Sequence, residues 1–198
     1  MKRLMDVIGA AAGLIVAGLP MLLIASAIRI RMGAPVLHRS TRPGRDGVPF
    51  VMYKFRTMQE LYDEHHRLLP DHRRITPLGL LLRRTSLDEL PELYNVLRGD
   101  MSLVGPRPLL MRYLPLYSPE QARRHEVRPG VTGWAQIHGR NSIPWEEKLA
   151  LDVWYVDHRS LAVDLKILAT TVIKVVRREG MSADGDLDVP EFKGSAPA

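Results

Sequence analysis

Residues 7–28 read VIGAAAGLIVAGLPMLLIASAI, an apolar stretch that contains no charged side chain. At about 1.5 Å per residue, a helix of this length would reach roughly 33 Å, and a hydrocarbon core is about 30 Å thick. The stretch is therefore long enough to form a membrane helix. Pro20 lies near its middle and removes the backbone hydrogen bond to Val16, which predicts a break or bend in the helix near Pro20.

Basic residues flank this stretch on both sides. Lys2 and Arg3 precede it, and Arg29 and Arg31 follow it. Because basic residues mark the cytoplasmic side of a membrane, a spanning helix would carry one of these groups to the wrong side. A bent, re-entrant helix would instead enter and leave on one face, where anionic lipid attracts both flanks. We favour the re-entrant helix, with the rest of the chain in the cytoplasm.

Two other interpretations of the apolar stretch remain open. A proline kink also occurs in helices that span the membrane completely. A secretory signal peptide would also begin with basic residues, and Ala25-Ser26-Ala27 is similar to a cleavage site. Against a signal peptide, the apolar stretch exceeds the usual length of about 7–15 residues, and arginines follow the site at once.

The composition favours an anionic partner and excludes some classes of site. The chain has 198 residues, a formal net charge of +6 and a pI near 9.8. The absence of cysteine excludes disulfides and thiolate zinc sites. Only 6% of the residues are aromatic and no nucleic-acid-binding module is recognisable, so we expect no nucleic-acid partner. The charge then points to membrane lipids or to phosphorylated small molecules.

After the apolar stretch the patterns predict a mainly α fold with short β elements. Residues 50–56 alternate as in an extended segment. Helical patterns cover residues 59–69, 77–84, 90–98, 142–157 and 163–178. Ser142 or Asn141 could cap the fourth of these helices. The last of these is amphipathic and would either pack on the core or lie on the membrane surface.

These patterns divide the chain into three parts. Residues 1–32 would form the re-entrant membrane helix, broken near Pro20. Residues 33–183 would form one α-rich cytoplasmic domain with amphipathic helices on its surface. Residues 184–198 are small, polar and acidic, which predicts a flexible tail.

Asp88 and Glu89 are adjacent carboxylates at the predicted start of a helix. In a purely structural interpretation, Asp88 is the N-cap, Glu89 favours the positive helix end, and Pro91 fits the first turn. In a functional interpretation, the same helix end attracts a phosphate. An aspartate that is ionised at neutral pH can attack phosphorus without a general base. The two interpretations are compatible.

A carboxylate that attacks a diphosphate must overcome charge repulsion. Two unit charges 4 Å apart interact by about 4 kcal/mol at an effective dielectric constant of ~20. Mg²⁺ held by Asp88 and Glu89 would neutralise the diphosphate, and arginine side chains match the geometry of phosphate oxygens. The basic residues that are candidates for phosphate binding are Lys54, Arg56, Arg83, Arg107 and Arg140. A solvated surface cation is the alternative interpretation for each of them.

Five motifs resemble, in the same order, those of the bacterial sugar transferases, the small monotopic phosphoglycosyl transferases that begin glycan assembly on polyprenyl phosphate. The motifs are YKFRTM (53–58), SLDELP (86–91), LYNVLRGDMS (93–102), VGPRP (104–108) and RPGVTG (128–133). The resemblance extends from Lys2 to Gly180. The helix break of this family is commonly Ser-Pro, whereas this chain has Leu19-Pro20.

The resemblance implies a Mg²⁺-dependent transferase on the cytoplasmic face of the bacterial inner membrane, with residues 33–183 as the catalytic domain. Asp88 would attack the phosphate attached to the sugar of a UDP-sugar, release UMP and hold a covalent phosphosugar. Polyprenyl (undecaprenyl) phosphate would then accept the phosphosugar, in the first membrane step of glycan or glycoconjugate assembly. Glu89 would assist with the metal or a proton, and Pro106, Arg107, Pro108 and Arg140 would shape the phosphate site.

Two other functions compete with this one. A membrane-associated binding or scaffold protein could use the same basic surface without turnover. A basic nucleic-acid-binding protein with a membrane anchor is the weaker alternative. An assay of UMP release separates the enzyme from both.

Overall fold

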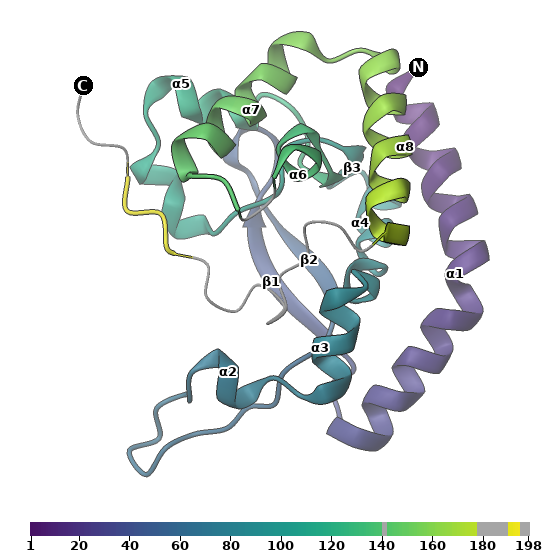
Figure 1. Cartoon of the computed structure of the whole chain (residues 1–198), viewed down its shortest axis with the longest axis vertical. Helices are drawn as coiled ribbons and strands as arrows, with labels where there is room; N and C mark the ends of the chain where they lie inside the picture. The colour runs from purple at the N-terminus through teal and green to yellow at the C-terminus, as the bar shows by residue number, and fades with distance from the viewer. Residues whose placement is uncertain (140–141, 178–189, 195–198) are drawn as a thin grey trace.

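The computed structural model describes residues 1–139, 142–177 and 190–194. It contains many helices, a few short strands and a long apolar N-terminal helix, which confirms the predicted fold class (Figure 1). Short 3-10 helices carry the label η. The described elements are α1 (Lys2–Met32), β1 (Leu37–Pro43), η1 (Arg45–Gly47), β2 (Pro49–Phe55), α2 (Asp71–Arg74), α3 (Pro77–Arg84), η2 (Leu87–Glu89), α4 (Glu92–Arg98), β3 (Ser102–Val104), η3 (Met111–Leu116), α5 (Pro119–Ala122), η4 (Arg123–His125), β4 (Gly130–Thr132), α6 (Trp134–His138), α7 (Trp145–His158) and α8 (Leu161–Arg177).

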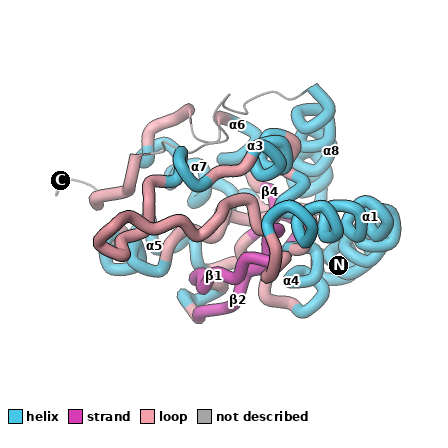
Figure 2. The backbone as a smooth tube through the Cα atoms, turned by 90° about the horizontal axis from the view of Figure 1, so that it is seen from below, coloured by secondary structure: helices cyan, strands magenta, loops and turns pink. Residues whose placement is uncertain are grey.

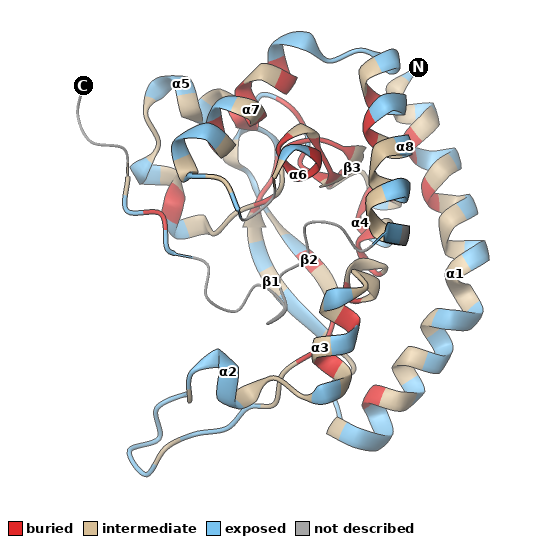
Figure 3. Ribbon diagram, viewed as in Figure 1, coloured by how far each residue is buried: buried red, intermediate tan, exposed pale blue. Residues whose placement is uncertain are grey.

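Helix α1 lies along one side of the domain (Figures 1 and 2). Its inner face packs on the domain, where Ala10 and Ile28 are fully buried. Its outer face is apolar and exposed, as Figure 3 shows by colour, and includes Ile15, Val16, Leu19, Leu22 and Leu23. By length and composition this helix is apolar enough to cross a membrane. It continues as a helix through Pro20, so a bend tight enough for re-entry stays a prediction.

Charged side chains tie the N-terminal end of α1 to the domain. The Lys2 ammonium lies 2.7 Å from the Asp164 carboxylate at the start of α8. Arg3 donates hydrogen bonds to two backbone carbonyls at the end of α4. Asp6 is 2% exposed and accepts a hydrogen bond from the Ser102 hydroxyl of β3. These contacts connect three elements of the domain to the first turns of α1.

The strands form two separate two-stranded sheets. β1 and β2 are antiparallel, with Leu37 opposite Phe55 and Pro43 opposite Pro49. β2 confirms the extended segment predicted at residues 50–56. β3 and β4 form a short parallel pair. Figure 1 shows the β1–β2 hairpin in the middle of the domain, with α5 to α7 at one end and α3 at the other.

The prediction of a helix at residues 59–69 is wrong. This segment forms an irregular loop, with an isolated bridge between Tyr62 and Leu68. The Asp63 carboxylate accepts hydrogen bonds from the backbone N–H groups of His65 and Arg67, and His66 has a φ of 56°. An aspartate that binds the backbone in this way favours a turn over a helix.

The other predicted helices are present, and all but α3 have ends that differ from the prediction. α3 has the predicted bounds, and α4 begins at Glu92, two residues after the predicted start. α7 begins at Trp145 with Pro144 at the N-cap and no side-chain cap, so the cap predicted at Ser142 is wrong. The alternative cap, Asn141, lies outside the described residues.

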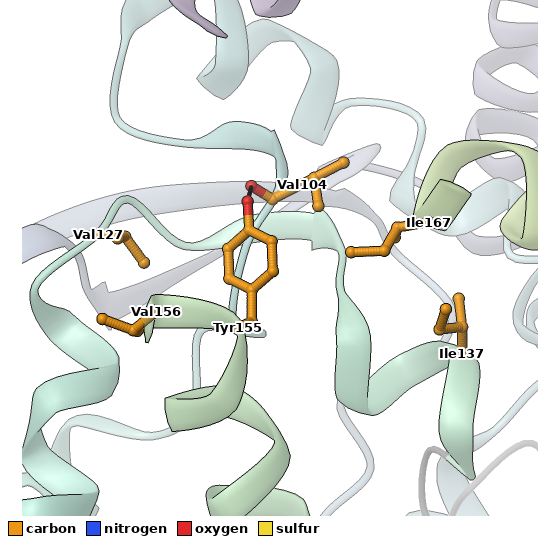
Figure 4. Packing of buried hydrophobic residues seen from close by; sticks show 6 residues of the cluster. All are labelled: Val104, Val127, Ile137, Tyr155, Val156 and Ile167. Atoms are coloured by element: carbon orange, nitrogen blue, oxygen red, sulfur yellow. Dashed lines mark hydrogen bonds between the residues drawn. The ribbon is translucent and has the colours of Figure 1, made fainter. Parts of the chain in front are cut away.

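The largest core cluster fills the space between α6, α7, α8 and the β3–β4 pair (Figure 4). Its buried members are Val104, Val127, Ile137, Tyr155, Val156 and Ile167. The Tyr155 hydroxyl donates a hydrogen bond of 2.6 Å to the Asp164 carboxylate. Ile167 anchors α8 on this core, whereas Leu165 and Val172 are more than half exposed. α8 is therefore a core-packing helix that also presents an apolar outer face.

The segment predicted as a flexible tail contains one described stretch, residues 190–194, and this stretch packs on the domain. Phe192 is 3% exposed and shares a hydrophobic cluster with Tyr113 and Leu149. The polar composition around Phe192 does not predict this contact. One aromatic residue is nevertheless sufficient to anchor a short segment when it packs against other aromatic residues.

Candidate active site

The turn between α3 and α4 presents Asp88. Ser86 adopts a left-handed conformation, with φ of 55°, and η2 follows directly. Pro91 occupies the N-cap position of α4 and no side chain caps this helix. The predicted N-cap role of Asp88 is therefore wrong: the carboxylate precedes the helix and remains available for other contacts.

Asp88 and Glu89 line a cleft of about 530 Å³. This volume is within the usual range of small-molecule sites, about 300–1,000 Å³. The lining is rich in cations, which suits a ligand with several negative charges. The basic residues of the lining, histidine aside, are Arg42, Lys54, Arg83, Arg107, Arg112, Arg124 and Lys148.

Glu89 is held by two of these cations. Its Oε1 atom accepts hydrogen bonds from Lys54 Nζ at 2.6 Å and from Arg107 Nη2 at 2.5 Å. Burial alone would raise the pKa of Glu89, but the charges of Arg107 and Lys54 outweigh burial and hold the pKa well below its usual range. Glu89 is therefore ionised and already neutralised by its neighbours.

Lys54 also faces a second, deeper carboxylate. Its Nζ atom lies 3.0 Å from Oε1 of Glu92, a residue that is 1% exposed. The two atoms form an ion pair, but their geometry is not that of a hydrogen bond. Burial raises the pKa of Glu92 to about 7, against the opposing charge of Lys54. Burial would lower the pKa of Lys54, but Glu89 and Glu92 raise it overall. Lys54 is thus a fixed cation between two carboxylates.

Asp88 differs from its neighbour Glu89. It is 8% exposed, and among the described residues no donor forms a hydrogen bond with its carboxylate. Burial and the adjacent Glu89 charge raise the pKa of Asp88 to about 6, although Lys54, Arg107 and Arg83 act in the opposite direction. A nearby cation or phosphate-bound metal would favour its ionised form. Among the described residues, Asp88 is therefore less constrained by neighbours than Glu89.

The structure gathers most of the predicted site residues. Asp88, Glu89, Lys54, Arg83 and Arg107 all line the cleft. Pro106 and Pro108 do not line it; both are buried and flank Arg107. Arg140 lies outside the described residues.

Arg56 lies away from the cleft lining. Its guanidinium donates hydrogen bonds to the carbonyl oxygens of Met32, Gly33 and Ala34, just where α1 ends. This position suits a cation, because the C-terminal end of a helix carries partial negative charge. Arg56 therefore fixes the end of the apolar helix.

Several lining residues are not predicted by any pattern in the sequence. Arg42 comes from β1, Arg112 from η3, and the buried pair of Arg124 and Asp152 from η4 and α7. No motif marks them, because they approach the cleft only through long-range contacts. Glu92 lies behind the lining, against Lys54, and its place three residues after Glu89 is a signal in the sequence that could have identified it.

The carboxylates fit Mg²⁺ that is shared with a diphosphate. Within the described part of the chain, no group of three or more His, Cys, Asp or Glu side chains is arranged to hold a metal ion. Mg²⁺ commonly takes only one or two protein carboxylates and completes its shell with substrate phosphates and water. Asp88 offers unbonded oxygens, and the two hydrogen bonds to Glu89 both use Oε1. This donor set suits a metal ion that arrives with the substrate.

Comparisons with known proteins show the family of the chain. The model of the family described as bacterial sugar transferase matches residues 1–178. The chain is 53% identical to the uncharacterized sugar transferase EpsL of Bacillus subtilis, over 98% of this chain and 96% of that protein. It is 43% identical to a UDP-glucose:undecaprenyl-phosphate glucose-1-phosphate transferase of Caulobacter vibrioides, over 86% of this chain and 68% of that protein.

A third relative is longer than this chain. The undecaprenyl-phosphate galactose phosphotransferase of Salmonella typhimurium is 38% identical, over 84% of this chain but only 40% of that protein. The family match includes the apolar helix α1, the Asp88-Glu89 pair and helices α7 and α8. The chain is a membrane-associated transferase that belongs to the bacterial sugar transferase family.

Proposed function

We propose that the protein transfers a sugar 1-phosphate from a UDP-sugar to polyprenyl phosphate on the cytoplasmic face of the inner membrane. The observation that carries this proposal is the largely buried Asp88 carboxylate, which has no hydrogen-bond partner within the described part of the chain and shares one cleft with Lys54, Arg83 and Arg107. The names of the Caulobacter and Salmonella relatives support undecaprenyl phosphate as the acceptor class.

The reaction has two displacements at one phosphorus atom. In the first, an Asp88 oxygen forms a bond to the phosphorus that carries the sugar, and the bond to the bridging oxygen breaks. UMP leaves with that electron pair, and the sugar phosphate remains on Asp88. In the second, an oxygen of polyprenyl phosphate attacks the same phosphorus and releases the Asp88 carboxylate. The products are UMP and polyprenyl diphosphate sugar.

The cations around Asp88 would make this attack possible. Arg107 and Lys54 lie beside Glu89 and offset the charge of the approaching diphosphate. Glu89, which binds both, holds them in place and does not itself need to react. Mg²⁺ held by Asp88, Glu89 and the diphosphate would supply further positive charge on the phosphate oxygens.

The attachment of α1 supports a re-entrant arrangement. Its N-terminal end is tied to the domain by Lys2 and Asp164, and its C-terminal end by Arg56. If both attachments persist at the membrane, the two ends of the helix would lie on the same side of it. The exposed apolar residues between the ends would then enter the near leaflet, close to the lipid acceptor.

Single cysteines test this arrangement, because the chain has none of its own. Leu4→Cys and Ala34→Cys introduce exposed thiols at the two ends of α1. We expect a membrane-impermeant maleimide to label both only from the cytoplasmic side, as it labels a Lys193→Cys control on the domain. Labelling of the two ends from opposite sides would establish a spanning helix.

The product identifies the reaction class. Purified protein with undecaprenyl phosphate, Mg²⁺ and a panel of UDP-sugars is expected to release UMP, and EDTA is expected to stop the release. Release of UDP would instead indicate ordinary glycosyl transfer. Binding without either product would favour the scaffold function.

A further inference from the structure

The C-terminal segment of residues 190–194 is docked by an aromatic anchor. The ring of Phe192 lies 5.7 Å from that of Tyr113, 5.6 Å from that of Tyr117 and 5.5 Å from that of Trp145, measured between ring centroids. Phe192 is 3% exposed, although its neighbours Glu191 and Lys193 are exposed. Burial of this ring is the main apolar contact of the segment.

Polar contacts fix the direction of the segment. The indole N–H of Trp145 donates a hydrogen bond of 2.8 Å to the carbonyl oxygen of Pro190. The Arg112 guanidinium lies 2.6 Å from the Glu191 carboxylate. The Phe192 N–H donates to the Tyr113 hydroxyl at 3.4 Å. Both backbone and side chains therefore determine how the segment lies.

This docked segment forms part of the cleft that contains Asp88. Pro190 and Glu191 line the cleft together with Arg112, Tyr113 and Trp145. The family model ends at residue 178, so this part of the wall lies outside the family match. The cleft of this chain therefore includes a contribution that the family motifs do not contain.

The segment lies on the side of the domain away from the apolar helix. Figures 1 and 2 show residues 190–194 and α1 at opposite sides in two perpendicular views. A lipid phosphate is held by the membrane and would reach the cleft from the side of α1. A soluble nucleotide sugar has no such restriction and can occupy the end beneath the segment.

We propose that residues 190–192 form a nucleotide-sugar-binding wall of the cleft, anchored by Phe192, and that they determine affinity for the UDP-sugar but not for the lipid acceptor. Lys193 is exposed and does not line the cleft, so it lies outside this wall. This inference rests on the proposed function for its substrate class. Arg112 supports it, because Glu191 holds this cation at the cleft wall, where it suits a phosphate or a ribose hydroxyl. Loss of the anchor would open this end of the cleft.

Phe192→Ala tests the wall, and Lys193→Ala, a change at the exposed neighbour, is the matched control. For Phe192→Ala we expect the KM for the UDP-sugar to rise about tenfold, with kcat and the KM for undecaprenyl phosphate within about twofold of wild type, as for loss of uniform binding. Lys193→Ala should match wild type in kcat and in the KM values for both substrates. Unchanged KM values for Phe192→Ala, or an equal rise for both substrates, would overturn the inference.

A binding measurement separates this inference from the proposed reaction. Calorimetry with UDP alone, in Mg²⁺, requires no turnover and is expected to show weaker binding to Phe192→Ala than to Lys193→Ala, with circular dichroism unchanged. If UDP bound to wild type and to Lys193→Ala more tightly than to Phe192→Ala, but wild type released no UMP, the proposed reaction would be wrong and the proposed wall would still be supported. Equal affinity of the two variants for UDP would contradict the proposed wall, even if the enzyme were active.

Discussion

Asp88→Asn is expected to reduce UMP release by about 10³-fold or more, because an amide cannot form the phosphosugar bond that the carboxylate forms. The change keeps the size of the side chain. It also removes a carboxylate whose charged form is disfavoured by burial, since burial raises the pKa of Asp88 to about 6. We therefore expect a melting temperature equal to or above that of wild type, so the loss of activity would not reflect unfolding.

Asp71→Asn is the matched control for this variant. Asp71 also lines the cleft, but its side chain is 54% exposed and pairs with Arg74 at 3.5 Å. We expect this variant to retain activity within about threefold of wild type, because exposed ion pairs contribute little. Turnover by Asp88→Asn at the rate of Asp71→Asn would remove Asp88 from the role of nucleophile.

The proposed covalent step can also be tested directly. Wild-type enzyme mixed with UDP-sugar and Mg²⁺, without the lipid, is expected to release up to one UMP per active site and to gain the mass of one sugar phosphate. The added mass should map to the peptide that contains Asp88. A direct, single-displacement transfer would instead require the lipid before any UMP appears.

The sequence predicted the parts of this protein that depend on local patterns. The apolar stretch before Arg29, the extended segment at residues 50–56 and the helix at residues 77–84 all follow from composition and periodicity. The cap assigned to Asp88 failed for a local reason as well. Ser86 adopts a left-handed conformation that propensity disfavours, and this turn separates Asp88 from the helix.

The remaining features depend on contacts between distant residues. Arg42 and Arg112 enter the cleft because the β1–β2 hairpin and η3 approach each other, and neither belongs to a motif. Phe192 anchors a segment whose composition is typical of disorder, because its partners Tyr113 and Trp145 come from other elements. Periodicity describes one segment at a time and cannot pair such residues.

Arg124 and Asp152 illustrate a site contribution of this long-range kind. Both side chains are 2% exposed, and Arg124 Nη2 lies 2.7 Å from the Asp152 carboxylate. The same nitrogen donates a hydrogen bond of 2.7 Å to the carbonyl oxygen of Arg107. Because the guanidinium of Arg107 binds Glu89 beside the proposed nucleophile, we expect the buried pair to position the proposed phosphate site through the backbone.

Arg124→Met is expected to destabilise the protein by about 3–5 kcal/mol, because it leaves the Asp152 carboxylate buried without its partner. The double variant Arg124→Met/Asp152→Leu should recover most of this free energy of unfolding, since apolar side chains often replace a buried ion pair at little cost. Chemical denaturation measures both values. Arg123→Met is the control. Arg123 also connects η4 to α7, through Asp157, but its ion pairs are exposed, so we expect a much smaller change than for Arg124→Met.

Activity distinguishes a positioning role for Arg124 from a purely structural one. The stable double variant still lacks the hydrogen bond to the Arg107 carbonyl, and a displacement of about 1 Å at a reacting group can cost roughly 10²-fold in rate. We therefore expect its kcat to stay about 10- to 100-fold below that of wild type, with Arg123→Met unaffected. In an Arg107→Ala background the same double change should cost little more, because the group that it positions is gone. Full kcat in the double variant would mean that the buried pair only stabilises the fold.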